Sequence, residues 1–366
     1  MTRAARTPSA SNRLGLDYRA EAERLGPPVT PIIDAHAHIN GRDSARVYEE
    51  ARRAYGVVHV FSQTLPSNAE AVRSVLGESV SFVAVPDYTA PDRLRAHREG
   101  FLDDIRMWHG LGARMVKFWC APRGRDYGRE VGDETLMLLD NPWRRKQMDL
   151  AASLGMSFMV HIADPDTWFR TKYRDASRYG TKHEQYEPLE RLGEEYRNIP
   201  WLLAHMGGSP EDLGFLAGLL ERHPNFIIDT SATKWMVREL SKHPRGALLE
   251  FLQQFRGRVL FGSDIVTHDA HLSDDPGPRG MGEQARNEQE AFDLYASRYW
   301  AYRTMLETSY EGESPIADPD LAMVEPDRFD AMSAPVLRGF ALPPEELRVL
   351  YREACEGTLT AWYARG

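Results

Sequence analysis

The sequence contains 366 residues, of which 42% are hydrophobic and 27% are charged. This composition is typical of a globular protein with one large core or two smaller ones, and it excludes disordered, collagen-like and disulfide-stabilised chains. Acidic residues outnumber basic ones by 54 to 45, and no Lys/Arg-rich block occurs, so we expect neither nucleic-acid binding nor membrane binding. The predicted partner is a small-molecule substrate.

Residues 1–28 are predicted to form a polar tail that ends in a short helix at 17–25. This segment lacks the apolar stretch of a secretory signal, and no run of about 18 apolar residues follows it. The two cysteines, Cys120 and Cys355, are far apart in the chain and do not suggest a disulfide framework. We therefore expect a cytoplasmic protein whose main unit comprises residues 29–366.

Eight short apolar segments rich in Val, Ile and Phe are predicted to be β-strands. They comprise residues 31–39, 56–63, 79–88, 113–119, 156–162, 199–205, 225–231 and 258–264. Amphipathic segments lie between them, and several begin at Ser, Asp or Asn and end at Gly, as helices do: 43–56, 90–112, 141–155 and 209–224. This alternation predicts an α/β fold, a (β/α)8 TIM barrel.

A helical insertion is predicted after the eighth strand, at residues 265–340. It contains a Gly/Pro/Asp-rich loop at 271–283, an aromatic-rich helix at 284–308 and a Pro-rich return. Because loops after barrel strands shape the active site, the insertion is a candidate lid or a contact with a second copy. The alternative is a helix that packs on the side of the barrel. A homodimer is the expectation from its many aromatic residues: Phe292, Tyr295, Tyr299, Trp300 and Tyr302.

Five residues that can bind a metal or transfer a proton stand at the ends of predicted strands. His36 and His38 lie two apart in the first strand, and the period of two places both imidazoles on one side of it. His161, His205 and Asp264 end the fifth, sixth and eighth strands. The carboxyl ends of barrel strands converge on the catalytic face, and His and Asp are good ligands of zinc and manganese. The pattern predicts a metal-dependent active site.

These residues, within the phrases IIDAHAHI, LLAHMGG and VLFGSD, resemble the amidohydrolase superfamily, in particular the branch that contains aminocarboxymuconate semialdehyde decarboxylase. The resemblance covers about residues 30–265 and a C-terminal helix, in which relatives usually carry an Asn near positions 353–355. It implies that His36, His38, His161 and Asp264 bind one divalent metal, zinc in the first place and manganese as the alternative. It also implies that His205 and Asp264 act as acid or base beside this metal.

Lys117, near the end of the predicted fourth strand, leaves two interpretations open. In binuclear members of the superfamily, a lysine of this strand is carbamylated and bridges two metals, and His205 would then become a ligand. In the single-metal branch, the lysine stays a protonated amine that orients a substrate carboxylate. The resemblance to that branch favours the amine.

Cationic and aromatic residues in the loops after the strands are candidates for substrate binding. Cations pair with carboxylates and aromatic rings stack on planar groups, so these residues suit an anionic, planar substrate. The candidates are Lys117, Trp119, Trp168, Arg170, Lys234 and His268.

The resemblance implies three alternative functions. The first is hydrolysis, in which a metal-bound water attacks a C–N or C–O bond of a small anionic substrate and His205 or Asp264 transfers the proton. The second is non-oxidative decarboxylation of an aromatic or dienoic acid, in which carbon receives a proton before carbon dioxide leaves. The third, a ligand-binding barrel without catalysis, is disfavoured because the whole set of candidate ligands is present.

Overall fold

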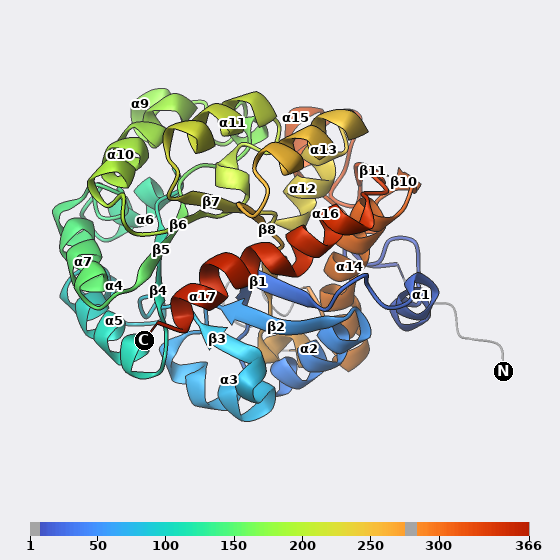
Figure 1. Ribbon diagram of the computed structural model, residues 1–366, viewed down its shortest axis with the longest axis horizontal. Helices are drawn as coiled ribbons and strands as arrows, with labels where there is room; N and C mark the ends of the chain where they lie inside the picture. Colours follow the sequence, from blue (N-terminus) through green and yellow to red (C-terminus); the bar gives the residue numbers. More distant parts are fainter. Residues whose placement is uncertain (1–7, 275–283, 366) are drawn as a thin grey trace.

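The computed structural model describes residues 8–274 and 284–365. Its centre consists of eight parallel strands, each within one of the predicted segments: β1 Ile32–His38, β2 Val57–Ser62, β3 Val80–Phe82, β4 Met115–Trp119, β5 Ser157–His161, β6 Trp201–Leu203, β7 Phe226–Asp229 and β8 Val259–Leu260. A further short strand, β9 Ile265–Val266, follows β8 closely. The prediction of a (β/α)8 TIM barrel is confirmed, and Figure 1 shows the strands around a common centre.

The strands pair in chain order within two sheets, β3-β2-β1-β9 and β4-β5-β6-β7-β8. A parallel bridge between Ala84 and Val116 connects the sheets on one side. On the other side, the backbone N–H of Asp264 donates to the carbonyl of His36 at 2.8 Å. Two short strands share the eighth position of the barrel, since β8 pairs with β7 and β9 pairs with β1.

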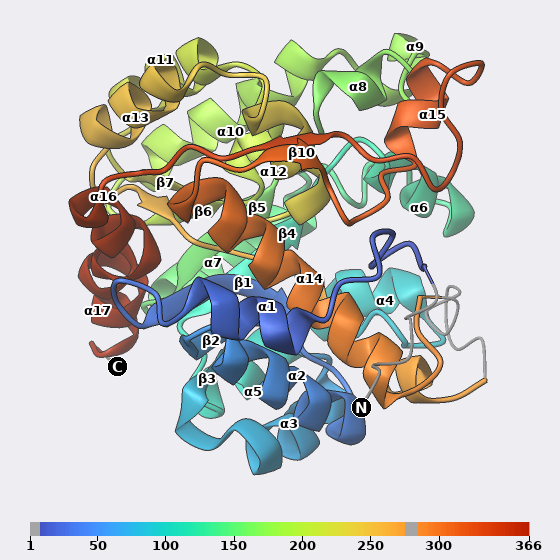
Figure 2. The same cartoon turned by 90° about the vertical axis from the view of Figure 1, so that its right-hand side faces the viewer.

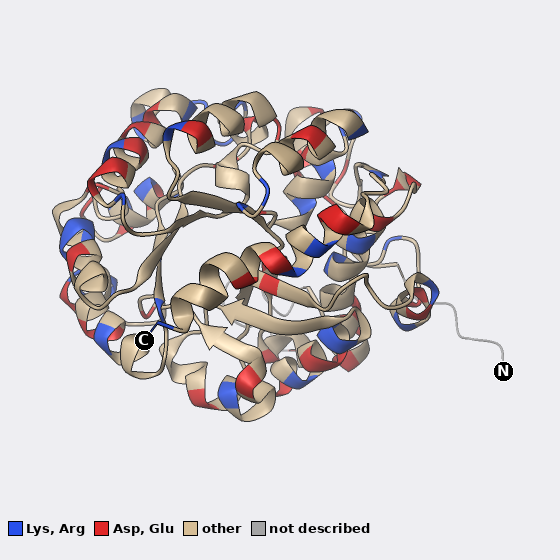
Figure 3. Cartoon of the chain, viewed as in Figure 1, with Lys and Arg blue, Asp and Glu red and all other residues tan. Residues whose placement is uncertain are grey.

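Helices surround the strands and carry most of the charged residues, whereas the strands are largely uncharged (Figure 3). Asn141, Asp212 and Asn287 cap the helices that begin at Pro142, Leu213 and Glu288, and each accepts a hydrogen bond from a backbone N–H of the first turn. The longer helices are α1 Tyr18–Leu25, α2 Arg42–Ala54, α3 Ala69–Leu76, α5 Glu99–Gly110, α7 Pro142–Ser153, α10 Lys182–Glu195, α11 Leu213–Arg222, α12 Thr233–Leu240, α13 Arg245–Gln254 and α14 Glu288–Glu307. The shorter ones are α4 Arg93–His97, α6 Gly124–Glu130, α8 Asp166–Phe169, α9 Ala176–Tyr179, α15 Asp320–Val324, α16 Pro344–Arg348 and α17 Ala361–Tyr363.

The C-terminal helical segment closes the amino-terminal end of the barrel. Its residues Val349, Ala354, Cys355 and Leu359 pack against apolar side chains that point inward from the strands or their ends: Ile33, Phe61, Val83, Met115, Met159, Leu202, Ile227 and Leu260. In Figure 1, α16 and α17 cross the mouth of the barrel. A site inside the barrel must therefore open at the opposite end, where the strands have their carboxyl ends.

An irregularity in β1 aims the two histidines of this strand. Ala35 packs with the inward-pointing residues, and strict alternation would continue with Ala37. The pairing of β1 with β2 shifts register between Asp34 and Ala37, however, and Ala37 packs in the apolar layer outside the barrel. A β-bulge of this kind reverses the alternation, so His36 and His38 face the interior.

The insertion helix α14 lies on the side of the barrel against α1 and α2 (Figure 2). Its aromatic side chains are at most 2% exposed: Phe292, Tyr295, Tyr299, Trp300 and Tyr302. Because these rings pack within the chain, they offer no surface to a second copy. They agree with the alternative interpretation, a helix that packs on the side of the barrel. Of the loop predicted at 271–283, residues 275–283 lie outside the described part of the chain.

Two further segments pack beside α14. The residues after it form α15 and an antiparallel hairpin, β10 Glu311–Glu313 with β11 Val336–Arg338. The N-terminal residues from position 8 run next to this region, since Arg13 donates its backbone N–H to the carbonyl of Pro315 at 2.8 Å. Among the helices that the structure describes, none has the length and apolar character needed to cross a membrane.

Candidate active site

A cavity of about 730 Å³ opens at the carboxyl ends of the strands. All eight strands or the residues within four positions after them contribute to its wall: His38, Gln63, Val85, Lys117, His161, His205, Ala232 and Asp264. A volume of this size is typical of small-molecule sites. The structure thus brings most of the residues predicted from the sequence to one place.

Three side chains converge beside the cavity, two that line it, His38 and Asp264, and the buried His36. His36, His38 and Asp264 each offer a donor atom, and these atoms lie within 4.8 Å of one another. Asp264 Oδ1 is 3.2 Å from His38 Nε2 and 3.5 Å from His36 Nε2. His36 Nε2 is buried, and no described atom forms a hydrogen bond with it. An unsatisfied buried nitrogen is unfavourable, and coordination to a metal would satisfy it, so these residues fit a divalent metal ion.

Three residues that line the cavity have left-handed backbone conformations. The φ angles of His205, Ala232 and Asp264 are 60°, 68° and 59°. Each of these residues follows the end of a barrel strand, and each lines the cavity. Such conformations are strained by about 1–3 kcal/mol for residues other than Gly, and they persist where the surroundings hold them in place, often at functional sites.

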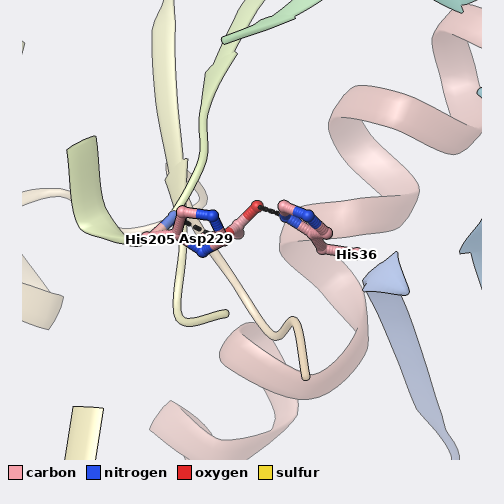
Figure 4. A group of neighbouring side chains, drawn as sticks. All are labelled: His36, His205 and Asp229. Carbon is pink, nitrogen blue, oxygen red and sulfur yellow. Dashed lines mark hydrogen bonds and ion pairs between the residues drawn. The ribbon is translucent and has the colours of Figure 1, made fainter. Parts of the chain in front are cut away.

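Asp229, which the sequence analysis missed, connects the two buried histidines (Figure 4). Its Oδ2 accepts a hydrogen bond from His36 Nδ1 at 2.9 Å, and its Oδ1 accepts one from the backbone N–H of His205 at 2.9 Å. Ser231 Oγ lies 2.9 Å from His36 Nδ1 and 2.8 Å from His205 Nδ1. A carboxylate that binds Nδ1 of a histidine fixes its ring and leaves Nε2 free for a metal.

Asp229 stays ionised in this position. Burial raises the pKa of its carboxyl group, but His36, His205 and the hydroxyl of Ser231 together outweigh burial and hold the pKa below the ordinary value. The signal in the sequence was an acidic residue at the end of the apolar phrase NFIID. It was missed because the acid that ends the seventh strand was not considered as a partner of the histidines.

His161 and His205 lie side by side, with ring centroids 4.5 Å apart and ring planes at 80°. Two groups of described side chains could hold a metal, the one with Asp264 and a second one of His36, His205 and Asp229. His161 belongs to neither, and its Nε2 lies 2.8 Å from Asp164 Oδ1. Burial and the neighbouring His161 lower the pKa of His205 well below its ordinary value, so its imidazole is neutral at neutral pH.

The model of the protein family described as Amidohydrolase matches residues 31–353. The chain belongs to the Amidohydrolase family. It is therefore an enzyme, and the cavity at the carboxyl ends of its barrel strands is the candidate active site.

Solved structures with similar folds include hydrolases and decarboxylases. A probable 2-pyrone-4,6-dicarboxylic acid hydrolase from Acinetobacter baumannii is 12% identical over 74% of this chain and 92% of its own, with a TM-score of 0.39. A 2,6-dihydroxybenzoate decarboxylase is 12% identical over 92% and 100%, with a TM-score of 0.39. The 5-carboxyvanillate decarboxylase of Novosphingobium aromaticivorans, in complex with manganese, is 12% identical over 93% and 97%, with a TM-score of 0.35. No curated protein matches this amidohydrolase.

Two lysines predicted to bind substrate face the cavity of this amidohydrolase, Lys117 from β4 and Lys234 from α12. Burial lowers the pKa of each amine to about 8. Asp229 and Asp264 act in the opposite direction on Lys117, but neither forms an ion pair with it, and within the described residues Lys234 has no carboxylate partner either. Both amines are thus available to an anionic ligand.

The remaining predicted substrate residues divide into two groups. Trp119 and His268 line the cavity, whereas Trp168 does not, because its Nε1 donates to Asp320 Oδ2 at 2.6 Å. Arg170 lines a second cavity of about 680 Å³, between α12 and residues 311–338. One cation of the active-site cavity was missed by the sequence analysis. It is Arg298, which α14 contributes.

Proposed function

We propose that this amidohydrolase is a metal-dependent hydrolase that cleaves a C–N or C–O bond of a small anionic substrate. The convergence of His36, His38 and Asp264 around the unpartnered Nε2 of His36, beside the cavity, supports the proposal. We propose His161, which also lines the cavity, as the fourth ligand of a single divalent metal. Zinc is the first candidate and manganese the second, since both accept histidine and carboxylate ligands.

A metal held there would act as a Lewis acid, polarising the substrate's carbonyl group and lowering the pKa of water to roughly 7. The protein would perform the other tasks. His205 has a neutral imidazole and accepts the proton of the attacking water. Asp264, 3.2 Å from His38 Nε2, is the second group that can accept a proton there. Asp229 keeps the proton of His36 on Nδ1, and the amine of Lys117 holds an anionic group of the substrate.

One observation favours a second candidate, non-oxidative decarboxylation. The amine of Lys117 faces the cavity from the strand next to that of His161 and has no carboxylate partner among the described residues. It could therefore hold the carboxylate that leaves as carbon dioxide. His205, once protonated, would deliver the proton to the carbon atom.

The metal content of the protein tests the proposal. Mass spectrometry of the elements would be applied to protein purified without chelator and without a metal-binding tag. We expect about one equivalent of zinc or manganese per chain, as for sites with three or four protein ligands. About two equivalents would favour the alternative in which carbamylated Lys117 bridges two metals. No metal, even after incubation with zinc or manganese, would refute the proposal.

The fate of solvent oxygen separates the two reactions. A screen of amides, lactones and aromatic or dienoic acids would be carried out in water labelled with oxygen-18. Hydrolysis places labelled oxygen in the product, whereas decarboxylation releases carbon dioxide and leaves the organic product unlabelled. Labelled product would support hydrolysis, and unlabelled product with carbon dioxide would assign the second candidate.

A further inference from the structure

We propose that Lys234 and Arg298 form a second anion-binding subsite in the active-site cavity, which binds a carboxylate of the substrate remote from the bond that reacts. The inference deepens the proposed function, on which it rests, because it makes the substrate a dicarboxylate. Both residues line the cavity, but neither comes from a barrel strand. Lys234 belongs to α12, and Arg298 belongs to the insertion helix α14.

The guanidinium group of Arg298 is fixed in place by neutral partners. Its Nη1 donates to Ser297 Oγ at 2.8 Å and to Ser11 Oγ at 3.3 Å. Within the described residues, no carboxylate forms an ion pair with this group. Burial lowers the pKa of Arg298 to about 10, so it remains charged at neutral pH. A fixed, charged guanidinium that lines a cavity and has no ion-pair partner among the described residues is a suitable partner for a carboxylate of a ligand.

Lys234 places a second positive charge near the first. Besides burial, repulsion from Arg298 lowers the pKa of the Lys234 amine, so the two charges act on each other. Asp318 and Asp320 favour the charged amine, but both carboxylates accept hydrogen bonds from the buried Arg238. Asp264 likewise favours the charged Arg298, but within the described residues neither Lys234 nor Arg298 forms an ion pair with a carboxylate. A bound carboxylate would relieve the repulsion and gain two charge-assisted hydrogen bonds.

The charges that line the cavity indicate room for two anionic groups. Lys117, Lys234 and Arg298 face it, whereas Asp264 is the one carboxylate among its described lining residues. Asp264 belongs to the proposed metal group, and Lys117 lies on a barrel strand, as the proposed metal ligands His36 and His38 do. One anionic group of a substrate can bind at Lys117 and the metal. The second is left for Lys234 and Arg298.

Binding of paired probes to the zinc-loaded protein tests the subsite. Isothermal titration calorimetry would compare isophthalate with benzoate, and glutarate with butyrate. We expect at least one dicarboxylate to bind about tenfold or more tightly than its monocarboxylate, as for an added charge-assisted contact. Lys234→Met and Arg298→Met should each reduce this ratio to about threefold or less and leave the affinity for the monocarboxylate within about twofold. The exposed Lys146 and Arg106 provide matched controls, and K146M and R106M should keep the wild-type ratio.

The proposal is overturned if neither dicarboxylate binds more tightly than its monocarboxylate, or if the variants weaken both members of a pair equally. Circular dichroism would verify folding. If Arg298→Met does not fold, Arg298→Lys, which keeps the charge, replaces it. Arg298→Lys should then retain more of the preference for the dicarboxylate than Lys234→Met does. Failure of the proposed function is seen separately. Protein that binds no metal but still prefers dicarboxylates would reject the function and keep the subsite, whereas metal-loaded protein without the preference would reject only the subsite.

Discussion

Replacing Asp229 by Asn tests whether this buried carboxylate prepares His36 for metal binding. Oδ1 of Asp229 accepts hydrogen bonds from the backbone N–H groups of His205 and Ser231, at 2.9 and 3.0 Å. It also accepts one from the hydroxyl of Ser231. In Asp229→Asn, these three donors still need an acceptor, so the amide oxygen must occupy the Oδ1 position. The amide NH₂ then faces His36 Nδ1, which must accept a hydrogen bond and therefore loses its proton. The proton moves to Nε2, the atom proposed to bind the metal.

The size of the effect follows from this change of tautomer. Removing the partner that orients a metal-binding histidine lowers metal affinity by about 10- to 100-fold. This corresponds to about 1.4 to 2.8 kcal/mol, at about 1.4 kcal/mol for each factor of ten. The volume of the side chain is almost unchanged and Asp229 is fully buried, so we expect no cavity and no loss of packing.

Competition with a chromophoric chelator would measure the zinc affinity of wild type and variant. Asp318→Asn is the matched control, because Asp318 is also a buried carboxylate, 1% exposed, but pairs with Arg238 outside the proposed metal group. We expect reduced zinc affinity for Asp229→Asn and wild-type affinity for the control. Unchanged affinity in a folded Asp229→Asn protein would refute the reasoning, as would an equal loss in both variants.

Three further substitutions address other parts of the molecule. Asp264→Asn should abolish turnover without changing the circular dichroism spectrum, and retained turnover would contradict the proposed site. Tyr299→Phe removes the hydroxyl that donates to buried Asp34 at 2.9 Å, and should lower the free energy of unfolding in urea by about 1–3 kcal/mol. Lys234→Met tests how the free energy of unfolding depends on pH. Burial and Arg298 lower the pKa of Lys234 to about 8, below the unfolded value of about 10.4. Between these values the unfolded state binds more protons, so wild-type stability should rise with pH relative to the variant, and a constant difference in urea midpoints would contradict this.

The strand pattern was predictable because burial in a parallel barrel requires continuous apolar segments with helices between them. The strands β1 and β5 lie inside the predicted segments 31–39 and 156–162. The environment of α14 was not predictable. Phe292, Tyr295, Tyr299 and Tyr302 are spaced three or four residues apart and share one face of the helix, and an apolar face fits burial within the chain as well as contact with a second copy.

The candidate ligands were predictable one at a time. His36 and His38 were proposed from their spacing, and His161 and Asp264 from their places at strand ends. The direction of the two histidines of β1 depends on the bulge between Asp34 and Ala37, which alternation alone does not indicate.

The contacts around those ligands were beyond the sequence, because they join residues far apart in the chain. Asp229 meets His36 across 193 positions, and the hydroxyl of Tyr299 meets Asp34 across 265. The loop after β5 showed the same limit, since the composition of a loop does not fix which of its side chains turn toward a cavity. Arg170, predicted to bind substrate, lines a different cavity.

The sequence by itself determined the barrel, the end of the barrel that carries the candidate site, and the residue types of a candidate metal centre. These three features follow from local hydrophobic patterns and from the side-chain chemistry at strand ends, and short segments of the sequence contain both. The tertiary structure alone decided that Asp229 orients the histidines and that Arg298 reaches the cavity from α14. Both depend on distances between segments that only the folded chain brings together.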